Sequence, residues 1–333
     1  FQFGVISLGK KWMSMTKVEK YRAFCEIEKS IPLFSQAWWL DLVCDSNWDV
    51  CLVERNGETI ASQPCFVKKR YGFTLLTQPP LTQNLGPWIQ PSKANYSKAL
   101  AQEKDLMHEL ITQLPRHDYF QQNWHYNRTN WLPFYWKGFQ QTTGYTYVID
   151  DISNLDKVWS NTQANIKTDI RKARDRFKLH VRTDLQIKEF IKLNKLTFGR
   201  QGMALPYRES VVINIFEKAS TREQCKVFVA QDEAGQNHAG VFVIWDENSA
   251  YYLMGGGDPK LRNSGATSLC MWEAIKFSST VTKRFDFEGS MIESVERFFR
   301  GFGALQKPYI SVFKTNSKVL KAEFFLRELL KKS

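Results

Sequence analysis

Three consecutive stretches in the second half of the chain combine apolar and β-branched residues with strand-like length. They are CKVFVAQ (225–231), AGVFVIWD (239–246) and SAYYLMGG (249–256), separated by DEAGQNH and by a short Glu-Asn turn. Runs of this length joined by short turns predict three strands in an antiparallel meander.

A helix and two further strands are predicted after the meander. The Gly- and Pro-containing loop GDPKLRNSGATS (257–268) leads into LCMWEAIKFSST, where Leu269, Trp272 and Ile275 lie on one side of a helix. The strand KRFDFE (283–288), the helix ESVERFFRGF ended by Gly303, and the strand KPYISVF follow.

The first half of the chain repeats this order of elements. WDVCLVER (48–55), a turn at Gly57 and TIASQPCFVKK (59–69) predict a hairpin, which the Gly/Pro-rich QPPLTQNLGPW follows. A helix over residues 93–114 and strands near 117–124 and 145–149 complete the set. The sequence therefore predicts two related α/β units, one over residues 1–150 and one over residues 151–333.

Composition is that of a folded protein with a large core. The 333 residues are 43% hydrophobic and 14% aromatic, which suffices for two domains. No run approaches the 18 apolar residues of a membrane span. The first residues, FQFGVISLGKKWMSM, lack the order of a signal peptide and include Met13 and Met15 as candidate starts. We expect a cytoplasmic protein.

The cysteines and histidines show no metal-binding or catalytic spacing. The six cysteines are scattered without a C-x-x-C pair, and most have apolar neighbours, so we expect buried, reduced thiols. The five histidines form neither a metal site nor a triad pattern, and we interpret them as structural or surface residues. No metal is predicted.

The net charge of +12 indicates an anionic partner. Nucleic acid, anionic lipid headgroups in peripheral membrane contact, and a phosphorylated cofactor or substrate all fit. Residues 165–183 concentrate the charge, with seven Lys or Arg against two Asp. At helical spacing they form an apolar face and a basic ridge, the latter made by Lys167, Arg171, Arg174 and Lys178. A solvated helix face is the simpler interpretation of that ridge.

The loop before the helix near residue 268 is a candidate anion site. A helix N-terminus offers unpaired amides and the positive end of a dipole, and Gly265 permits a close approach of the backbone. We expect replacement of Gly265 to affect anion binding rather than the fold. The alternative is an ordinary loop in which Ser264 or Thr267 caps the helix.

The order of these motifs resembles a known family. Arg262-Asn263-Ser264-Gly265-Ala266-Thr267 is similar to the coenzyme A loop of GNAT acyltransferases, with Thr267 where Gly or Ala is expected. YYLMGGGDPKLRNSGATSLCMWEAI, then FDFEGS and RFFRGFGALQKPY, resembles FemAB-like proteins, which include the Fem-type peptidyltransferases of peptidoglycan synthesis. SQAWWLDL and the hairpin from WDVCLVER extend the likeness over most of residues 30–315.

The resemblance implies fold, activity and partners. The expected fold is α/β (α+β), with two tandem GNAT-like domains, each a mixed, mostly antiparallel sheet flanked by helices. The expected activity is acyl or aminoacyl transfer to an amine, such as that of a bacterial cell-wall precursor. The donor is an acyl-CoA or an aminoacyl-tRNA. The tRNA-dependent enzymes often carry a long helical hairpin, and its absence between Leu193 and Cys225 favours a CoA thioester.

The candidate site residues follow from the loop and from the chemistry. The resemblance implies that coenzyme A is held by Arg262, Asn263, Ser264, Gly265, Ala266 and Thr267. Acyl transfer also requires stabilisation of an oxyanion, for which the amides of Gly255 and Gly256 are the natural donors. The segment LTFGRQGMALPYRES interrupts helical periodicity, and the resemblance implies that Arg200 and Tyr207 face an acceptor cleft.

FDFEGSMIESVERFFRGFGA (285–304) supplies the candidate catalytic acids. On a strand, Phe285 and Phe287 alternate with Asp286 and Glu288, so both carboxylates share one face while the rings enter the core. Asp286 or Glu288 would orient the attacking amine or accept its proton. Arg300 would reach a ligand phosphate or pair with an acid one turn away. The alternative is a structural carboxylate–arginine pair.

Three classes of function are therefore compared. An acyltransferase is favoured over a catalytically inactive binding scaffold of the same fold. A nucleic-acid-binding protein is the third class. It has only the charge in its favour, because no helix-turn-helix, zinc-finger or RRM signature is present, and we expect no DNA partner.

Overall fold

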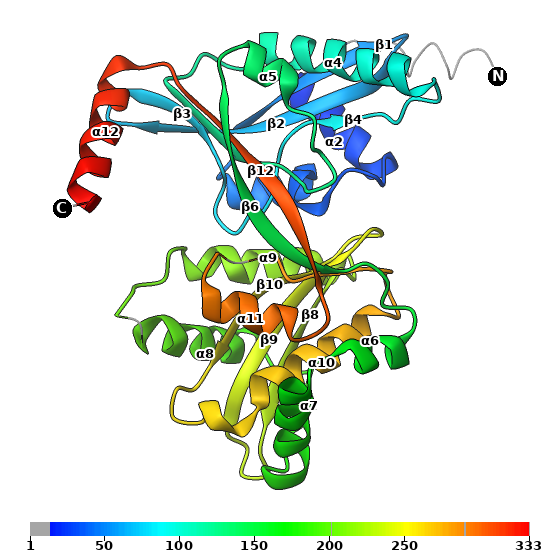
Figure 1. Cartoon of the computed structure of the whole chain (residues 1–333), viewed down its shortest axis with the longest axis vertical. Coiled ribbons are helices and arrows are strands. Elements are labelled where there is room, and N and C mark those ends of the chain that lie inside the picture. Colours follow the sequence, from blue (N-terminus) through cyan, green and yellow to red (C-terminus); the bar gives the residue numbers. More distant parts are fainter. Residues whose placement is uncertain (1–13, 201, 290, 333) are drawn as a thin grey trace. The chain divides into compact units, whose positions relative to one another are not determined.

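The computed structural model describes residues 14–200, 202–289 and 291–332, and these form two compact units. Unit 1 runs to Gly144 and resumes at Tyr309, and unit 2 spans Tyr145–Pro308 (Figure 1). The change of unit lies close to the predicted boundary at residue 150. The return of the chain to unit 1 at Tyr309 differs from the predicted assignment of residues 151–333 to one domain.

Unit 1 begins with three short helices and a hairpin. Its helices and strands are α2 (Lys17–Ile27), a 3-10 helix (Leu33–Ser35), α3 (Ala37–Val43), β1 (Trp48–Arg55), β2 (Glu58–Arg70), β3 (Phe73–Thr77), β4 (Trp88–Ile89), α4 (Tyr96–Thr112), β5 (Tyr119–Asn123), α5 (Leu132–Trp136) and α12 (Lys318–Lys332). Two more strands, β6 (Gln140–Ile149) and β12 (Leu305–Thr315), belong partly to each unit, because the chain changes unit within them.

The sheet of unit 1 has the order β1-β2-β3-β5-β12, with β4 paired to β2. β1, β2 and β3 are antiparallel, as predicted for the hairpin, whereas β5 runs parallel to β3 through Leu75–Tyr119 and Leu76–Phe120. The helix α4 packs on this sheet through Met107 and Leu110, both fully buried.

Unit 2 is built from the predicted meander and its helices. Its helices and strands are α6 (Leu155–Asn161), α7 (Ala164–Arg171), a π-helix (Lys172–Arg176), β7 (His180–Arg182), α8 (Ile187–Arg200), α9 (Glu209–Thr221), β8 (Cys225–Gln231), β9 (Asn237–Trp245), β10 (Ala250–Gly257), a 3-10 helix (Arg262–Ser264), α10 (Ala266–Ser278), β11 (Phe285–Asp286) and α11 (Glu293–Arg300).

The sheet of unit 2 has the order β6-β11-β10-β9-β8-β7. The antiparallel meander β8-β9-β10 is confirmed, and β11 then runs parallel to β10. Unit 1 shows the same succession, an antiparallel meander, a helix and a parallel strand. The predicted doubled pattern and the predicted α/β class, with mixed, mostly antiparallel sheets flanked by helices, are therefore confirmed.

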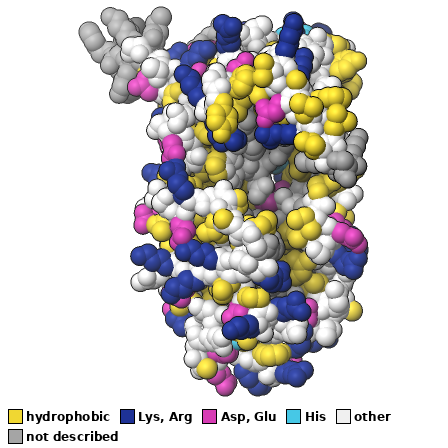
Figure 2. Space-filling view, turned by 90° about the vertical axis from the view of Figure 1, so that its left-hand side faces the viewer, with side chains coloured by type: hydrophobic (Ala, Val, Ile, Leu, Met, Phe, Trp, Pro, Cys, Tyr) yellow, Lys and Arg dark blue, Asp and Glu magenta, His cyan; other side chains and the backbone are white. Residues whose placement is uncertain are grey.

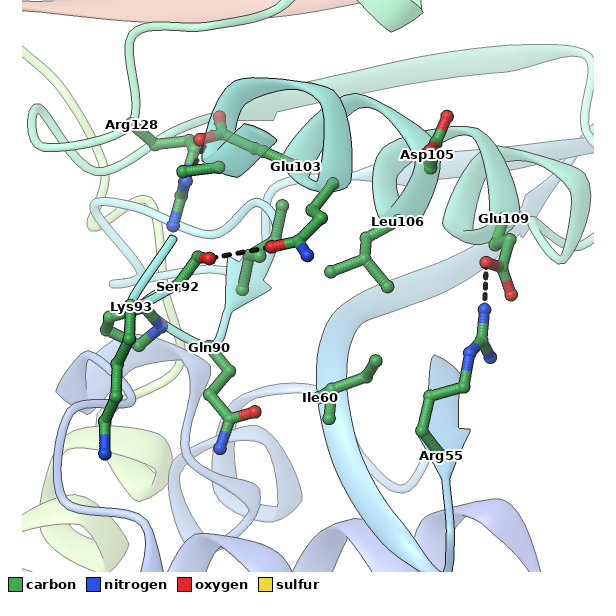
Figure 3. A pocket seen from close by; sticks show the side chains of 14 residues that line it. Arg55, Ile60, Gln90, Ser92, Lys93, Glu103, Asp105, Leu106, Glu109 and Arg128 are labelled. Carbon is green, nitrogen blue, oxygen red and sulfur yellow. Dashed lines mark hydrogen bonds and ion pairs between the residues drawn. The ribbon is translucent and has the colours of Figure 1, made fainter. Parts of the chain in front are cut away.

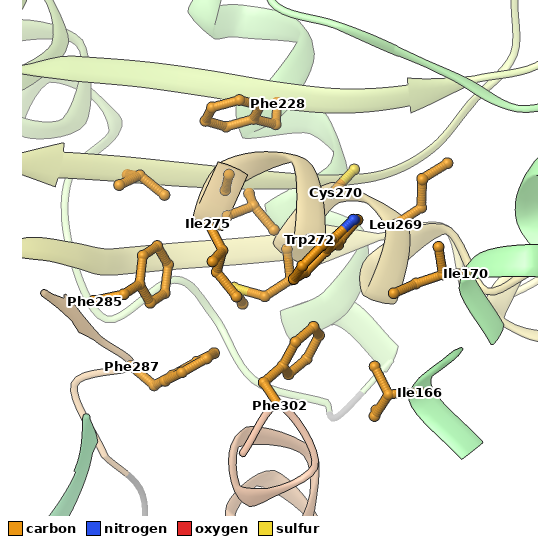
Figure 4. Close-up of a cluster of buried hydrophobic side chains, with 14 of the residues drawn as sticks. Ile166, Ile170, Phe228, Leu269, Cys270, Trp272, Ile275, Phe285, Phe287 and Phe302 are labelled. Carbon is orange, nitrogen blue, oxygen red and sulfur yellow. The ribbon is translucent and has the colours of Figure 1, made fainter. Parts of the chain in front are cut away.

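The core of unit 2 lies around α10, which packs against β8, β9 and β10. Figure 4 shows side chains from several segments converging there, among them Trp272 of α10, Phe285 of β11 and Phe302 after α11. Ile166 and Ile170 of α7 are buried in the same cluster, which confirms the predicted apolar face of the basic helix.

Replacing Phe285 by Ala should destabilise unit 2 by about 3–5 kcal/mol, because removal of a buried ring leaves a cavity in a packed core. Phe285 is fully buried, and its ring lies 4.9 Å from that of Phe287. Urea unfolding monitored by circular dichroism measures the change. The exposed Met291→Ala is the control and should shift stability by less than about 0.5 kcal/mol. Equal effects of the two substitutions would contradict this account of the core.

Candidate functional site

The edge of β10 becomes open where β11 ends. The parallel pairing joins only Ala250 with Phe285 and Tyr251 with Asp286. β10 continues to Gly257 with β9 on its other side, after a register shift between Tyr252 and Met254. A strand edge without a neighbour presents unpaired backbone groups. This edge therefore offers backbone groups to which a ligand can bind.

The helix α8 packs closely along that edge. The Asn194 side-chain amide donates to the Gly255 carbonyl at 2.7 Å, and the Gly257 N–H donates to Thr197 Oγ1 at 3.0 Å. A Cβ on Gly256 would lie 2.4 Å from the backbone nitrogen of Asn194, so this position has no room for a side chain. Strand alternation directs the N–H of Gly255 to the same edge as that of Gly257. The predicted oxyanion role of Gly255 and Gly256 remains a prediction.

A pocket of about 230 Å³ lies between the end of β10 and the start of α10. Six of the predicted site residues line it, namely Arg200, Gly255, Gly256, Arg262, Ala266 and Thr267. Asn263, Ser264, Gly265 and Tyr207 are not part of its lining. The structure thus brings both ends of the predicted loop, the glycine run and one predicted acceptor-side arginine to a single cavity.

The start of α10 has no side-chain cap. Gly265 occupies the N-cap position in the left-handed region with φ of 77°, and neither Ser264 nor Thr267 hydrogen-bonds the first helical amides. The Ser264 Oγ is buried and has no partner among the described residues. Since Ala266 and Thr267 line the pocket, the positive end of the α10 dipole faces it. This arrangement suits an anionic group.

Gly265 has a packing role as well. A Cβ on this residue would lie 2.2 Å from the carbonyl oxygen of Asp169 in α7, and the positive φ already disfavours other residues. The close approach that Gly265 permits is therefore the contact of its backbone with the backbone of α7. Because a larger residue would displace α7, replacement of Gly265 would disturb the fold, contrary to our expectation, and does not isolate anion binding.

His238 is a pocket residue that the sequence analysis missed. It is the second residue of β9 and is almost fully buried. Its Nε2 lies 3.1 Å from Asp232 Oδ2. Its Nδ1 is buried without a partner in the described part of the chain. The hydrogen bond to His238 helps to hold the pKa of Asp232 below its usual range, after the larger effect of the Gln236 backbone amide. A lone imidazole gives no spacing pattern, so only the fold could place it here.

Tyr207 lies beside the edge of β10 rather than in the pocket. Its hydroxyl donates to Asn194 Oδ1, and Asn194 in turn binds Gly255. Burial raises the pKa of Tyr207 to about 12, so the phenol keeps its proton at neutral pH. Tyr207 therefore positions Asn194 against the backbone of β10. Neither Asn194 nor Thr197 belongs to a motif that sequence reasoning would select.

Asp286 and Glu288 lie at the point where β11 leaves β10. Asp286 is buried, and its Oδ1 accepts from Thr146 Oγ1 at 2.5 Å and from the Glu288 N–H at 2.8 Å. The strand ends at Asp286, so it is shorter than the predicted 283–288, and Glu288 adopts φ of 62°. Glu288 Oε1 is buried and has no hydrogen-bond partner among the residues described. The rings of Phe285 and Phe287 enter the core as predicted.

The two carboxyl groups share a strongly desolvated environment. Burial raises the pKa of Asp286 to about 6, against the opposing hydrogen bonds from Thr146 and from the Glu288 amide. Burial raises the pKa of Glu288 well above its usual range, and the charge of Asp286 raises it further. Burial therefore raises the pKa values of both carboxyl groups, and that of Asp286 lies close to neutrality.

Arg300 and the basic ridge are engaged in ordinary surface contacts. Arg300 Nε donates to Glu296 at 2.7 Å, one turn away on α11, and lines no part of the pocket at α10. This contact is the predicted pairing of Arg300 with an acid one turn away, and not an ion pair with Asp286 or Glu288. In the ridge, Arg174 pairs with Glu273 at 2.7 Å, and Lys167 donates to the Ser160 carbonyl. The helix face is thus partly neutralised.

A larger cavity of about 790 Å³ lies in unit 1 between α4 and the β2–β4 side of its sheet. Figure 3 shows that its arginines are held by ion pairs, Arg55 with Glu109 and Arg128 with Glu103. Its floor is apolar, with Ile60 and Leu106. None of the predicted site residues lies in this cavity.

The cysteines are buried thiols, apart from the half-buried Cys225. Burial raises the pKa of Cys270 to about 12, so this thiol is not a thiolate at neutral pH. Within residues 14–200, 202–289 and 291–332 no group of three or more His, Cys, Asp or Glu is placed to hold a metal ion. None of the helices in those ranges combines the length and apolar character needed to cross a bilayer.

Replacing Asp286 by Asn should flatten the dependence of stability on pH. The wild-type carboxyl has a folded-state pKa of about 6, above the value of about 3.9 in an unfolded chain. The folded state thus binds more protons between these values, so the free energy of unfolding falls by about 2–3 kcal/mol as pH rises from about 4 to about 6. Asparagine keeps a side-chain oxygen that can accept the hydrogen bond from Thr146, but it has no carboxyl group to titrate.

Urea unfolding of wild type and Asp286→Asn across this pH range measures the difference. Asp156→Asn, at an exposed position on α6, is the matched control and should follow the wild type. A variant that retains the wild-type slope would show that Asp286 is not the group that titrates.

Comparison with known proteins agrees with this geometry. Residues 160–291 match the family model of the acetyltransferase (GNAT) domain. The solved structure of FemX aligns with 89% of this chain and over 96% of the FemX chain, with a TM-score of 0.66 and 14% identity. No curated protein matches the sequence.

Two further solved structures share the fold. L-PGS from Bacillus licheniformis aligns over 93% of this chain and 96% of its own, with a TM-score of 0.54 and 12% identity. The second is the C-terminal domain of a protein assigned as a lysylphosphatidylglycerol synthetase from Agrobacterium fabrum. It aligns over 86% of this chain and 89% of its own, with a TM-score of 0.52 and 10% identity. Residues 160–291 are thus similar to the acetyltransferase (GNAT) domain, within a chain that shares the fold of FemX.

Proposed function

We propose that the protein is an acyltransferase that moves an acyl or aminoacyl group from a phosphate-bearing donor to an amine. The observation that carries this proposal is the open edge of β10, which ends at a pocket formed with the N-terminus of α10. The match of residues 160–291 to an acetyltransferase domain supports the same reaction class.

An acyl-CoA is the donor that we propose first. Its pyrophosphate would lie against the uncapped start of α10, where Ala266 and Thr267 offer backbone amides and Arg262 and Arg200 offer positive charge. The thioester arm would then extend along the open edge of β10. The fold shared with a protein assigned as a lysylphosphatidylglycerol synthetase supports an aminoacyl donor such as aminoacyl-tRNA as the alternative.

The chemistry requires an oxyanion donor and a proton acceptor. The amine attacks the acyl carbonyl, the C–N bond forms, and the C–S or C–O bond to the donor breaks. We assign oxyanion stabilisation to the Gly255 N–H at the open edge. The proton leaves the amine for Asp286, whose pKa of about 6 suits a base at neutral pH. Glu288, the second carboxyl group at this corner, would orient the amine or accept the proton in place of Asp286. The leaving thiolate, or the leaving alkoxide of an ester donor, takes up the proton last.

The acceptor is an amine, and the family resemblance favours an anionic cell-wall precursor. The net charge of +12 would attract such a molecule without selecting it. In the bacterial peptidoglycan pathway that the resemblance implies, the acceptor amine belongs to a nucleotide- or lipid-linked muramyl peptide. The contrasting possibility is a catalytically inactive scaffold of the same fold. Turnover of acetyl-CoA with an amine acceptor would exclude it.

Coenzyme A should stabilise the protein, and Arg262→Gln should weaken that effect. At a hundred times the dissociation constant, a ligand adds about 2.7 kcal/mol to the free energy of unfolding. Loss of one charged hydrogen bond to phosphate should raise the dissociation constant about tenfold or more. Thermal unfolding with coenzyme A, acetyl-CoA or aminoacyl-tRNA measures both effects. Arg297→Gln, on exposed α11, is the matched control. Stabilisation by aminoacyl-tRNA alone would assign the donor to tRNA, and none by either would contradict the proposal.

Glu288→Gln and Asp286→Asn should each lower turnover about a hundredfold while coenzyme A binding stays unchanged, because each removes a group that handles the proton. Release of free coenzyme A from acetyl-CoA in the presence of a UDP-linked muramyl peptide is the measurement. Glu296→Gln, a surface acid paired with Arg300, is the control and should keep wild-type turnover. If both variants fold and turn over normally, this corner of unit 2 has only a structural role.

A further inference from the structure

One end of unit 1 combines exposed apolar side chains with a cluster of cations. The helix α12 docks on the sheet there through one side only. Leu320 is buried, and the ring of Phe324 lies 5.2 Å from that of Tyr119 in β5. These contacts fix which face of α12 is turned toward the protein and which is turned away.

The outward face of α12 is apolar. Phe325, Leu326 and Leu329 are 63%, 59% and 52% exposed, and Val319 on the first turn is exposed as well. At 100° per residue these four positions lie on one side of the helix. Lys321 flanks them along one edge, and Lys318 lies on the same side at the start of the helix. Soluble helices normally turn polar residues outward, so a face of this kind marks an interaction surface.

The tip of the β2–β3 hairpin has the same character. Lys68, Lys69 and Arg70 are exposed in succession, and Tyr71 at the tip is 85% exposed. The Arg70 guanidinium lies 5.0 Å from the Tyr71 ring centre. The Tyr71 ring held beside the Arg70 guanidinium, with two exposed lysines next to it in the chain, gives the hairpin tip both an amphipathic group and positive charge.

The hairpin and α12 lie next to each other in unit 1. The Asp118 carboxylate accepts from the Thr74 N–H at 2.9 Å, three residues after Tyr71. The Asp118 carbonyl accepts from the N–H groups of Asn316 and Ser317, directly before α12. Figure 1 shows both at the left of this unit, and Figure 2, which views that side, shows apolar side chains among Lys and Arg over its upper part.

We propose that residues 68–71 and the outward face of α12 form a docking surface for a bilayer that contains anionic phospholipid. The apolar side chains of α12 enter the boundary between headgroups and acyl chains, and Tyr71 lies at the same depth. The lysines and Arg70 remain at the level of the phosphates, where each cation adds to the attraction. The proposal is independent of the acyl transfer proposed for unit 2.

Charge and apolar character together favour a membrane over other partners. A single-stranded or folded RNA would use the cations, but the exposed leucines and Phe325 would contribute nothing to phosphate binding. A second copy of the chain would cover the apolar face, but it would bring lysines against lysines. A bilayer with anionic headgroups satisfies both features at once.

Vesicle binding by the full 333-residue chain tests the proposal. The protein should co-sediment with phosphatidylcholine vesicles that contain about 30% phosphatidylglycerol, bind pure phosphatidylcholine far more weakly, and lose binding at high salt. Lys68→Glu/Lys69→Glu/Lys321→Glu should weaken binding about a hundredfold, since each cation contributes about fivefold. Phe325→Gln/Leu329→Gln should weaken it at least about tenfold by removing apolar burial.

Matched variants elsewhere separate these effects from net charge and net hydrophobicity. Lys157→Glu/Lys188→Glu/Lys218→Glu carries the same change in charge on exposed positions of unit 2, and it should bind nearly as well as wild type. Ile27→Gln/Met291→Gln removes two other exposed apolar side chains and should do the same. Circular dichroism of every variant verifies that the fold is retained.

Three results would overturn the proposal. The first is equal binding of the test and control variants. The second is binding to bulk tRNA without binding to vesicles. If Phe325→Gln/Leu329→Gln leaves that tRNA binding unchanged, the cations are assigned to RNA. The third is a dimer in sedimentation velocity that the same variant dissociates, without vesicle binding, which would assign the apolar face to a second copy.

Discussion

The two-residue pairing of β11 with β10 is the constraint on which unit 2 depends. Phe285 and Phe287 hold β11 in the core around α10, while the strand itself ends at Asp286. Since β10 continues to Gly257, its edge loses a neighbour within the sheet. A longer β11 would fill that edge with hydrogen bonds. The short strand thus creates the open backbone and brings two carboxyl groups to its boundary.

Helix packing decides how much of the open edge remains. α8 approaches so closely that Gly256 has no room for a Cβ, and Asn194 takes up the Gly255 carbonyl. The same kind of contact joins Gly265 to the backbone of α7. These glycines are needed first for packing of helix on strand and of loop on helix. The start of α10 has no side-chain cap as a consequence, and its first residues, Ala266 and Thr267, line the pocket.

Desolvation, rather than a charged partner, sets the chemistry at the end of β11. Asp286 and Glu288 both have raised pKa values because burial disfavours their charged forms. Asp286 has two donors that stabilise its anion, whereas Glu288 has a buried oxygen without a partner in the described residues. The two neighbouring acids therefore differ in how far hydrogen bonds stabilise their anions. Such a pair suits proton transfer better than a structural ion pair with arginine, and Arg300 in fact pairs with Glu296.

The sequence by itself determined the elements and their order, because hydrophobic periodicity and turn residues act over a few positions. The meander from Cys225 to Gly257, the helix through Trp272 and the doubled succession of strands follow from such local patterns. So does the place of Arg262–Thr267 at a helix start. Only tertiary structure decided which groups meet across long distances. It placed His238 at the pocket, returned the chain to unit 1 at Tyr309, and gave Gly265 a neighbour in α7, because these contacts join segments whose own sequences carry no record of each other.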